Sequence, residues 1–232
     1  MKVIDSERAI VLEFEPTYPI VRGARAHEVA AHFGIDGDAS LPRARRRSRC
    51  PVGPPRPGEL MLLTGPSGSG KSSLLRALRR RATRAGITIV DLRRVALPEQ
   101  PVIELFERDL TLERTLKRLA RVGLAEVWTW LRPPSQLSEG QRWRLRLALA
   151  IERVERSGQP SLLLCDEFAA VLDRVSACIV SSVLRRAIDA HADRLAAVVA
   201  TSHDDLNAAL AADVTIECDF GRVTVMRKDG AW

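Results

Sequence analysis

The sequence lacks the features that mark several large classes of protein. Its apolar runs, such as residues 145–151, are short and interrupted by charge, and none approaches the roughly 20 residues of a membrane-spanning helix. Asp5 and Glu7 stand where a secretion signal would be apolar. The four cysteines include no Cys-x-x-Cys pair, which argues against a structural zinc site and fits reduced thiols. We therefore expect a cytoplasmic protein.

Acidic residues are too few to balance the basic ones, and the chain of 232 residues carries a formal charge of +7. Such an excess would suit a polyanionic partner. A compact basic run contains Arg43, Arg45, Arg46, Arg47 and Arg49. Nearly all the basic residues are arginine and alanine is abundant, as in proteins from GC-rich genomes, so the overall charge is weak evidence for nucleic-acid binding. Nucleic acid stays open as a partner.

The clearest motif is a glycine-rich turn that follows an apolar run and precedes a helical pattern. The turn reads Gly65, Pro66, Ser67, Gly68, Ser69, Gly70, Lys71, Ser72 and Ser73. Its glycines let successive backbone N–H groups face a phosphate, Lys71 adds a positive charge, and Ser72 offers a hydroxyl to Mg²⁺ at a helix N-terminus that favours anions. This segment predicts a phosphate-binding P-loop.

Apolar strand patterns alternate with helical patterns along most of the chain. The expected strands lie at residues 9–14, 59–64, 87–91, 161–167, 196–201, 214–217 and 223–226. The alternation predicts an α/β fold with a mostly parallel sheet and a C-terminal β-hairpin. We expect an N-terminal strand, helix and Arg-rich connection over 1–57 and a main domain over 58–232. Short helical patterns at about 101–156 indicate a helical insert.

Asp166 and Glu167 end an apolar strand that should lie in the same sheet as the P-loop. Open α/β sheets present their ligand groups at the carboxyl ends of strands. Asp166 would then hold Mg²⁺ through its water shell. Glu167 would orient and deprotonate the attacking water, a role worth typically about 10²–10⁴-fold in rate. Without a P-loop in the domain, such a pair would be read as a solvated turn.

A second segment that could bind an anion runs from Ser138 to Gln141. These two residues stand in the relation of a capping box, so a long helix should begin at Ser138. Its free N–H groups predict a second anion site, and a capped helix without a ligand is the alternative. If both segments serve one nucleotide, they would meet across two chains and make ATP the link of a head-to-tail dimer.

Two further polar residues lie in loops near the expected site. His203 follows the strand at 196–201 and could sense a γ-phosphate. Gln100 could supply its amide to Mg²⁺ or to water. Each is an ordinary surface residue if its loop turns away from the site.

Taken in order, these segments together with residues 171–173 resemble the complete motif set of an ATP-binding-cassette (ABC) ATPase, over about residues 58–218. The resemblance implies a P-loop NTPase fold with an ABC-type helical subdomain. It implies that the P-loop binds ATP and that Ser72, Gln100 and Asp166 serve Mg²⁺. It also implies that Glu167 is the catalytic base and His203 the switch histidine.

The same resemblance implies an ATP-dependent homodimer. Ser138, Gly140 and Gln141 would belong to the segment that contacts the γ-phosphate held by the opposite subunit, and Asp173 would lie in the loop that links the two sites. Glu139 departs from the family pattern, because it replaces a glycine and brings a carboxylate near the incoming triphosphate. Phe33 is the nearest candidate for the adenine-stacking aromatic that the family carries upstream of the P-loop.

The partner that such an ATPase would drive stays open. The runs at 137–144 and 165–169 look more like soluble, stand-alone cassette ATPases, some of which occur fused to or beside acetyltransferase-like domains. We therefore favour a switch acting on a partner protein or a nucleic-acid complex. The alternative is the ATP-binding subunit of an ABC transporter, which would need a separate permease. A P-loop nucleotide kinase and a nucleotide-gated binding module with negligible turnover are further alternatives.

Overall fold

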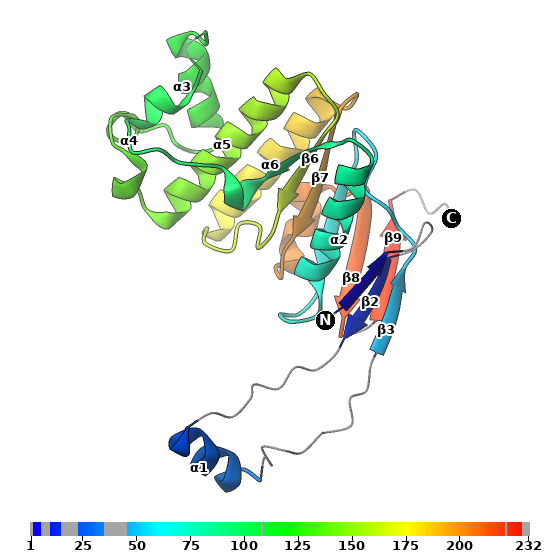
Figure 1. Ribbon diagram of the computed structural model, residues 1–232. Helices are drawn as coiled ribbons and strands as arrows, with labels where there is room; N and C mark the ends of the chain where they lie inside the picture. Colours follow the sequence, from blue (N-terminus) through cyan, green and yellow to red (C-terminus); the bar gives the residue numbers. More distant parts are fainter. Residues whose placement is uncertain are drawn as a thin grey trace.

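A six-stranded sheet forms the centre of the computed structural model, which describes residues 2–5, 10–14, 23–34, 46–107, 109–220 and 222–228 (Figure 1). Its strands are β4 Leu60–Thr64, β5 Thr88–Asp91, β6 Ser161–Cys165, β7 Leu195–Ala200, β8 Val214–Asp219 and β9 Arg222–Arg227. They lie in the order β5-β6-β7-β4-β8-β9. The first five are parallel, and β9 is antiparallel to β8. The predicted mostly parallel sheet with a C-terminal hairpin is confirmed.

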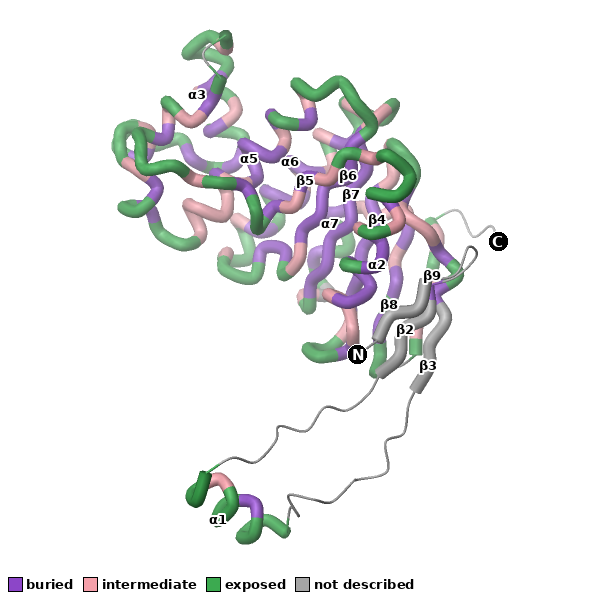
Figure 2. The backbone as a smooth tube through the Cα atoms, in the orientation of Figure 1, coloured by how far each residue is buried: buried purple, intermediate pink, exposed green. Residues whose placement is uncertain are grey.

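The central strands are buried along their whole length and are mostly apolar, because helices cover both faces of the sheet. Every residue of β4, β6 and β7 is buried, as the purple tube in Figure 2 shows. Successive residues of β4 face opposite sides. Leu60 and Leu62 belong to one core cluster, and Met61 and Leu63 belong to the other. The sheet therefore separates two hydrophobic layers.

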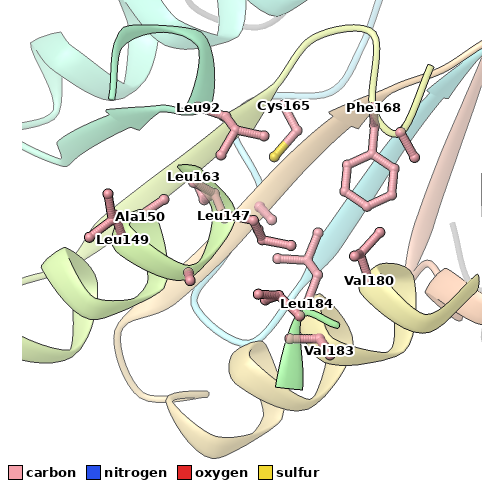
Figure 3. Packing of buried hydrophobic residues seen from close by; sticks show 14 of the residues in the cluster. Leu92, Leu147, Leu149, Ala150, Leu163, Cys165, Phe168, Val180, Val183 and Leu184 are labelled. Carbon is pink, nitrogen blue, oxygen red and sulfur yellow. The ribbon is translucent and has the colours of Figure 1, made fainter. Parts of the chain in front are cut away.

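Long helices supply the other half of each layer. They are α2 Lys71–Arg84, α5 Glu139–Ser157 and α6 Arg174–Ala190. Leu74 and Leu78 of α2 pack with Met61 and Leu63. Leu147 of α5 and Leu184 of α6 pack on the opposite face (Figure 3). A short 3₁₀ turn η4 at Asp204–Leu206 and helix α7 at Asn207–Leu210 lead into β8.

The segment between β5 and β6 is mostly helical, and its α3 and α4 extend beyond the sheet in Figure 1, while a separate helical insert at about 101–156 stays a prediction. The segment contains η1 Leu92–Arg94, η2 Val102–Leu105, α3 Leu112–Arg121, α4 Val127–Trp130 and η3 Pro134–Gln136. Gly123, at φ +78°, ends α3, and the N–H of Leu124 donates back to the carbonyl of Leu119 at 2.9 Å. Among the described residues no helix has the length and hydropathy to cross a membrane.

A separate antiparallel sheet of three strands lies near the N-terminus. It has the order β1 Lys2–Asp5, β2 Ile10–Phe14 and β3 Arg46–Cys50, and helix α1 Ala24–His32 comes between β2 and β3 in the chain. Ile10 and Cys50 are fully buried in the core cluster that contains Leu74 and Leu78. Of the basic run, Arg43 and Arg45 lie outside the described residues. The domain boundary at residue 57 stays a prediction.

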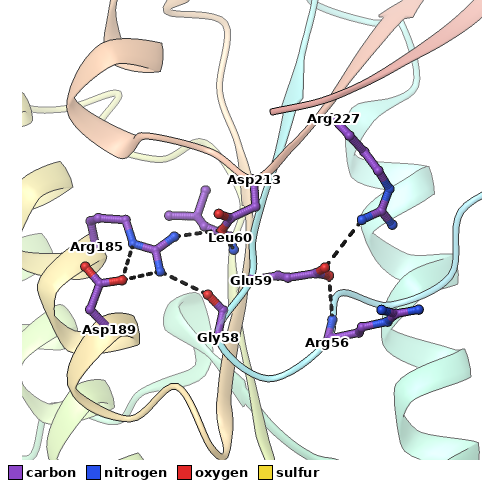
Figure 4. Close-up of polar contacts among 8 residues, drawn as sticks. All are labelled: Arg56, Gly58, Glu59, Leu60, Arg185, Asp189, Asp213 and Arg227. Atoms are coloured by element: carbon purple, nitrogen blue, oxygen red, sulfur yellow. Dashed lines mark hydrogen bonds and ion pairs between the residues drawn. The ribbon is translucent and has the colours of Figure 1, made fainter. Parts of the chain in front are cut away.

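A polar network holds α6 to the ends of β4 and β8 that lie away from the P-loop (Figure 4). The guanidinium of Arg185 donates to Asp213 at 2.8 Å, to the carbonyl of Gly58 at 3.0 Å and to Asp189 at 2.6 Å. The same carboxylate of Asp213 accepts the N–H of Leu60 at 2.7 Å. Nearby, Arg227 lies 3.4 Å from Glu59. These contacts fix the strands whose other ends carry the candidate site.

Candidate functional site

The turn between β4 and α2 is built by glycines in conformations that other residues rarely adopt. Gly65, Gly68 and Gly70 have φ values of +126°, +77° and +111°. At Gly65 a Cβ atom would lie 2.0 Å from the carbonyl oxygen of Cys218. Glycine is therefore required where the turn passes the end of β8, and α2 begins directly after Gly70, whose carbonyl accepts the N–H of Leu74 at 3.0 Å.

Polar groups inside this turn suit a polyphosphate. The Nζ atom of Lys71 donates to the carbonyls of Gly65 at 2.5 Å and Pro66 at 2.8 Å, so the ammonium lies along the turn. Ser69 is 1% exposed, and its hydroxyl is buried without a hydrogen-bond partner in the described part of the chain. A buried unsatisfied hydroxyl costs about 1–3 kcal/mol. A phosphate oxygen would satisfy it.

The carboxyl end of β6 brings Asp166 to the start of α2. The hydroxyl of Ser72 donates to Oδ1 of Asp166 at 3.0 Å, although 94 residues separate the two in sequence. The Asp166 side chain is 15% exposed, whereas that of Glu167 is 74% exposed. A hydroxyl beside a carboxylate is an all-oxygen donor set, which fits Mg²⁺.

The turn that carries Glu167 is strained and is held by a buried aromatic. Glu167 and Ala169 have φ values of +52° and +56°, which are uncommon for residues other than glycine. Phe168, between them, is fully buried and donates its N–H to the carbonyl of Ala200 at 2.8 Å. Its ring meets Trp143 of α5 edge to face, with centroids 5.1 Å apart. Phe168 thus anchors this turn to β7 and α5.

Sequence reasoning missed Arg93, which contacts both carboxylates. Arg93 lies in η1, directly after β5, and its guanidinium is 3.2 Å from Oδ2 of Asp166 and 2.6 Å from Oε2 of Glu167. Because β5 pairs in parallel with β6, residues that follow the two strands meet at one edge of the sheet. The sequence signal was only a basic residue directly after a predicted strand, because the strand order that brings Arg93 to Asp166 was not predicted. Arg93, Asp166 and Glu167 line a cavity of about 230 Å³ that Glu139 also lines.

The capping box predicted at Ser138 is confirmed. The hydroxyl of Ser138 accepts the N–H of Gln141 at 3.1 Å, and Oε1 of Gln141 accepts the N–H of Ser138 at 2.9 Å. Helix α5 accordingly begins at Glu139 with Ser138 as its cap. At Gly140 a Cβ atom would lie 3.1 Å from Leu172. The start of α5 therefore packs closely on the segment that leads to α6.

Three other predicted residues make local contacts. Asp173 caps α6, where its carboxylate accepts hydrogen bonds from Ser176 that lower the pKa of Asp173. The N–H of His203 donates to Thr201 at 3.1 Å, and the amide of Gln100 donates to the carbonyl of Glu104 at 3.1 Å. Within the described ranges, no hydrogen bond or ion pair joins these three residues to the carboxylates that follow β6. Their roles in the site stay predictions.

The cysteines are spread over the fold and differ in burial. All four are free, and Cys50, Cys165 and Cys218 are buried while Cys178 is exposed. Burial raises the pKa of the Cys218 thiol to about 12, so this residue beside the P-loop is a neutral packing group at physiological pH.

Comparison with known proteins matches this chain to ATPases and ATP-binding proteins. The model of a family described as "AAA ATPase domain" matches residues 48–213. An aliphatic sulfonates import ATP-binding protein of Nocardia farcinica is 34% identical over 186 residues, which cover 73% of this chain and 71% of that protein. The counterpart in Granulibacter bethesdensis is 31% identical over 192 residues, covering 74% and 73%.

Solved structures show the same fold. An ATP-binding cassette solved as a dimer in a post-hydrolysis state with ADP and phosphate has a TM-score of 0.55 and 20% identity, covering 74% of this chain and 86% of that one. A component of an ABC transporter complex from Clostridium perfringens has a TM-score of 0.50 and 22% identity, covering 72% and 76%.

Proposed function

The chain belongs to the ABC ATPases and is an ATP hydrolase, and on that premise we propose that two copies close head to tail around ATP to drive a partner. The observation that supports an ATP-hydrolysing site in each copy is the junction of β4 and β6. There the hydroxyl of Ser72 in the P-loop donates a hydrogen bond to Asp166, and Glu167 directly follows Asp166 in the chain. Binding groups and a candidate base therefore share one edge of the sheet.

The residues of this junction have distinct proposed roles. The P-loop N–H groups and Lys71 would bind the triphosphate, and Lys71 would exchange its carbonyl partners for phosphate oxygens. Ser72 and Asp166, with Gln100 as a further candidate, would hold Mg²⁺, which supplies charge neutralisation at the phosphates when bound. A phosphate oxygen would become the hydrogen-bond partner of the buried Ser69 hydroxyl.

Glu167 is the proposed general base. Its carboxylate is exposed and belongs to a turn held rigidly by Phe168, so it can reach a water molecule without moving the backbone. Arg93 neutralises Asp166 and Glu167 in the present arrangement. We propose that Arg93 must release these carboxylates before they can act, and that His203 senses the γ-phosphate.

The second half of the site would come from another copy. Ser138 is exposed and caps a 19-residue helix whose first N–H groups favour an anion. Ser138, Gly140 and Gln141 are therefore proposed to contact the triphosphate bound by the opposite subunit. Asp173 would lie between the two sites. Glu139 would bring a negative charge to the same interface and slow its closure.

The relatives favour a membrane permease as the partner, because their names describe ATP-binding proteins for the import of aliphatic sulfonates. A soluble partner, such as an acetyltransferase-like protein or a nucleic-acid complex, is the second candidate. It is favoured by the runs at 137–144 and 165–169, which resemble those of soluble, stand-alone cassette ATPases. Co-purification of the native chain from membrane and soluble fractions separates the two. ATPase stimulation by duplex DNA at low salt tests the nucleic-acid option.

Nucleotide binding by the P-loop is tested with Lys71→Ala. This variant should lose measurable ATP binding and hydrolysis, because the point charge on the triphosphate is gone. Lys117→Ala is the matched control, since Lys117 lies on the exposed surface of α3 and pairs with Glu113. Equal ATP affinity in Lys71→Ala and Lys117→Ala would contradict the proposal.

A further inference from the structure

Phe220 has a backbone conformation that residues with large side chains rarely adopt. Asp219 pairs with Arg222, so the loop between β8 and β9 has only two residues, of which Phe220 is the first. Its φ is +36°. Two-residue hairpin loops favour Asn, Asp or Gly at such a position, because larger side chains are strained there. Strained residues of this kind are concentrated at functional sites.

The ring of Phe220 lies against the P-loop. Its Cε1 atom is 3.8 Å from the position that a Cβ atom would take at Gly68. The residue is 49% exposed, so much of its aromatic surface faces solvent beside the turn. The close approach of Gly65 to the Cys218 carbonyl fixes the end of β8 on the same turn. A fixed, half-exposed aromatic ring next to a phosphate-binding turn can contact a ligand bound there.

Strand order determines which end of a nucleotide this ring would meet. In the sheet, β4 lies between β7 and β8, as the tube in Figure 2 shows. The carboxylates of Asp166 and Glu167 follow β6, on the β7 side of the P-loop. The γ-phosphate must point toward that side for hydrolysis, so the base extends toward the opposite side, where Phe220 lies. Aromatic side chains stack on nucleic-acid bases irrespective of base identity.

We propose that Phe220 stacks on the adenine ring of ATP bound at the P-loop; this inference rests on the proposed function. The hairpin between β8 and β9 then supplies the aromatic contact expected upstream of the P-loop. Phe33, the upstream candidate, is 74% exposed at the end of α1 and meets His32 edge to face. Figure 1 draws α1 apart from both sheets.

The test compares ATP with tripolyphosphate, which has the phosphates but no base. Phe220→Asn should weaken binding of Mg·ATP about tenfold in calorimetric titration and leave the affinity for Mg·tripolyphosphate unchanged. Because asparagine suits the loop conformation, the melting temperature should stay the same or rise. Phe220→Trp should restore ATP affinity, since an indole also stacks.

Three results would overturn the inference. In the first, Phe220→Asn binds ATP as tightly as the native chain. In the second, its affinities for ATP and for tripolyphosphate fall equally. In the third, Phe33→Ala shows the loss of ATP affinity instead. Trp128→Ala, which removes an aromatic that is 71% exposed on α4, is the control. Failure of the proposed function is distinguishable, because the native chain would then bind neither ATP nor tripolyphosphate.

Discussion

Arg93 offers a test of how the candidate site is held before nucleotide binds. Its guanidinium bridges Asp166 and Glu167, the two carboxylates that the proposed mechanism needs free. Arg93→Ala should therefore lower the Mg²⁺ concentration required for half-maximal ATP hydrolysis. The substitution removes a competing cation from the carboxylates and leaves the P-loop untouched.

The expected change in Mg²⁺ affinity follows from how far the paired side chains are exposed to solvent. The Arg93 side chain is 51% exposed and that of Glu167 is 74% exposed, so this ion pair contributes at most about 1 kcal/mol. Asp166 is 15% exposed, so its pair with Arg93 lies at the upper end of the same range. A competing interaction of about 1 kcal/mol corresponds to about a fivefold change in apparent Mg²⁺ affinity. The free energy of unfolding should fall by a similar amount.

The assay is the rate of phosphate release at fixed ATP and varied Mg²⁺. Arg94→Ala is the matched control, because the neighbouring Arg94 is 70% exposed and pairs with Asp91, 3.4 Å away, instead of the site carboxylates. Its Mg²⁺ dependence should equal that of the native chain. A loss of turnover in Arg93→Ala at every Mg²⁺ concentration would refute the reasoning, because Arg93 would then act on the nucleotide itself.

Two further predictions concern acidic residues. Glu152 is 3% exposed, and burial raises the pKa of its carboxyl, so its ionised form destabilises the fold above the ordinary pKa of glutamate. Glu152→Gln should raise the melting temperature by about 2 °C at pH 7, with the gain disappearing below about pH 4 in thermal scans; a gain that persists there would contradict this assignment. Glu139→Gln removes the charge that faces the proposed interface and should raise ATP turnover about threefold, corresponding to about 0.6 kcal/mol of repulsion. An unchanged rate would mean that Glu139 does not slow closure.

Local patterns were sufficient to predict the elements that depend on neighbouring residues in the chain. The glycines of the P-loop adopt the positive φ values that the motif requires, and Ser138 with Gln141 forms the expected capping box. The parallel sheet followed from buried strands such as β6, which carries Leu162, Leu163 and Leu164 in succession. In each case a short run of consecutive residues largely determines the local backbone conformation.

Features that depend on strand order were missed. Arg93 meets Asp166 because β5 lies beside β6, and Phe220 meets Gly68 because β8 lies beside β4. The spacing of residues along the sequence does not show which strands are neighbours in the sheet. Strand β3, which reads Arg-Arg-Ser-Arg-Cys, has almost no apolar alternation, so the sequence predicts only an Arg-rich connection there.

The most direct test of the shared site is the mass of Glu167→Gln in solution with and without Mg·ATP, measured by light scattering. This substitution removes the proposed base but keeps the P-loop and the Ser138 turn, so ATP should bind without being consumed. We expect a dimer that forms only with ATP and is lost when Ser138→Arg is added. A Glu167→Gln chain that binds ATP and remains monomeric at saturating concentration would contradict it.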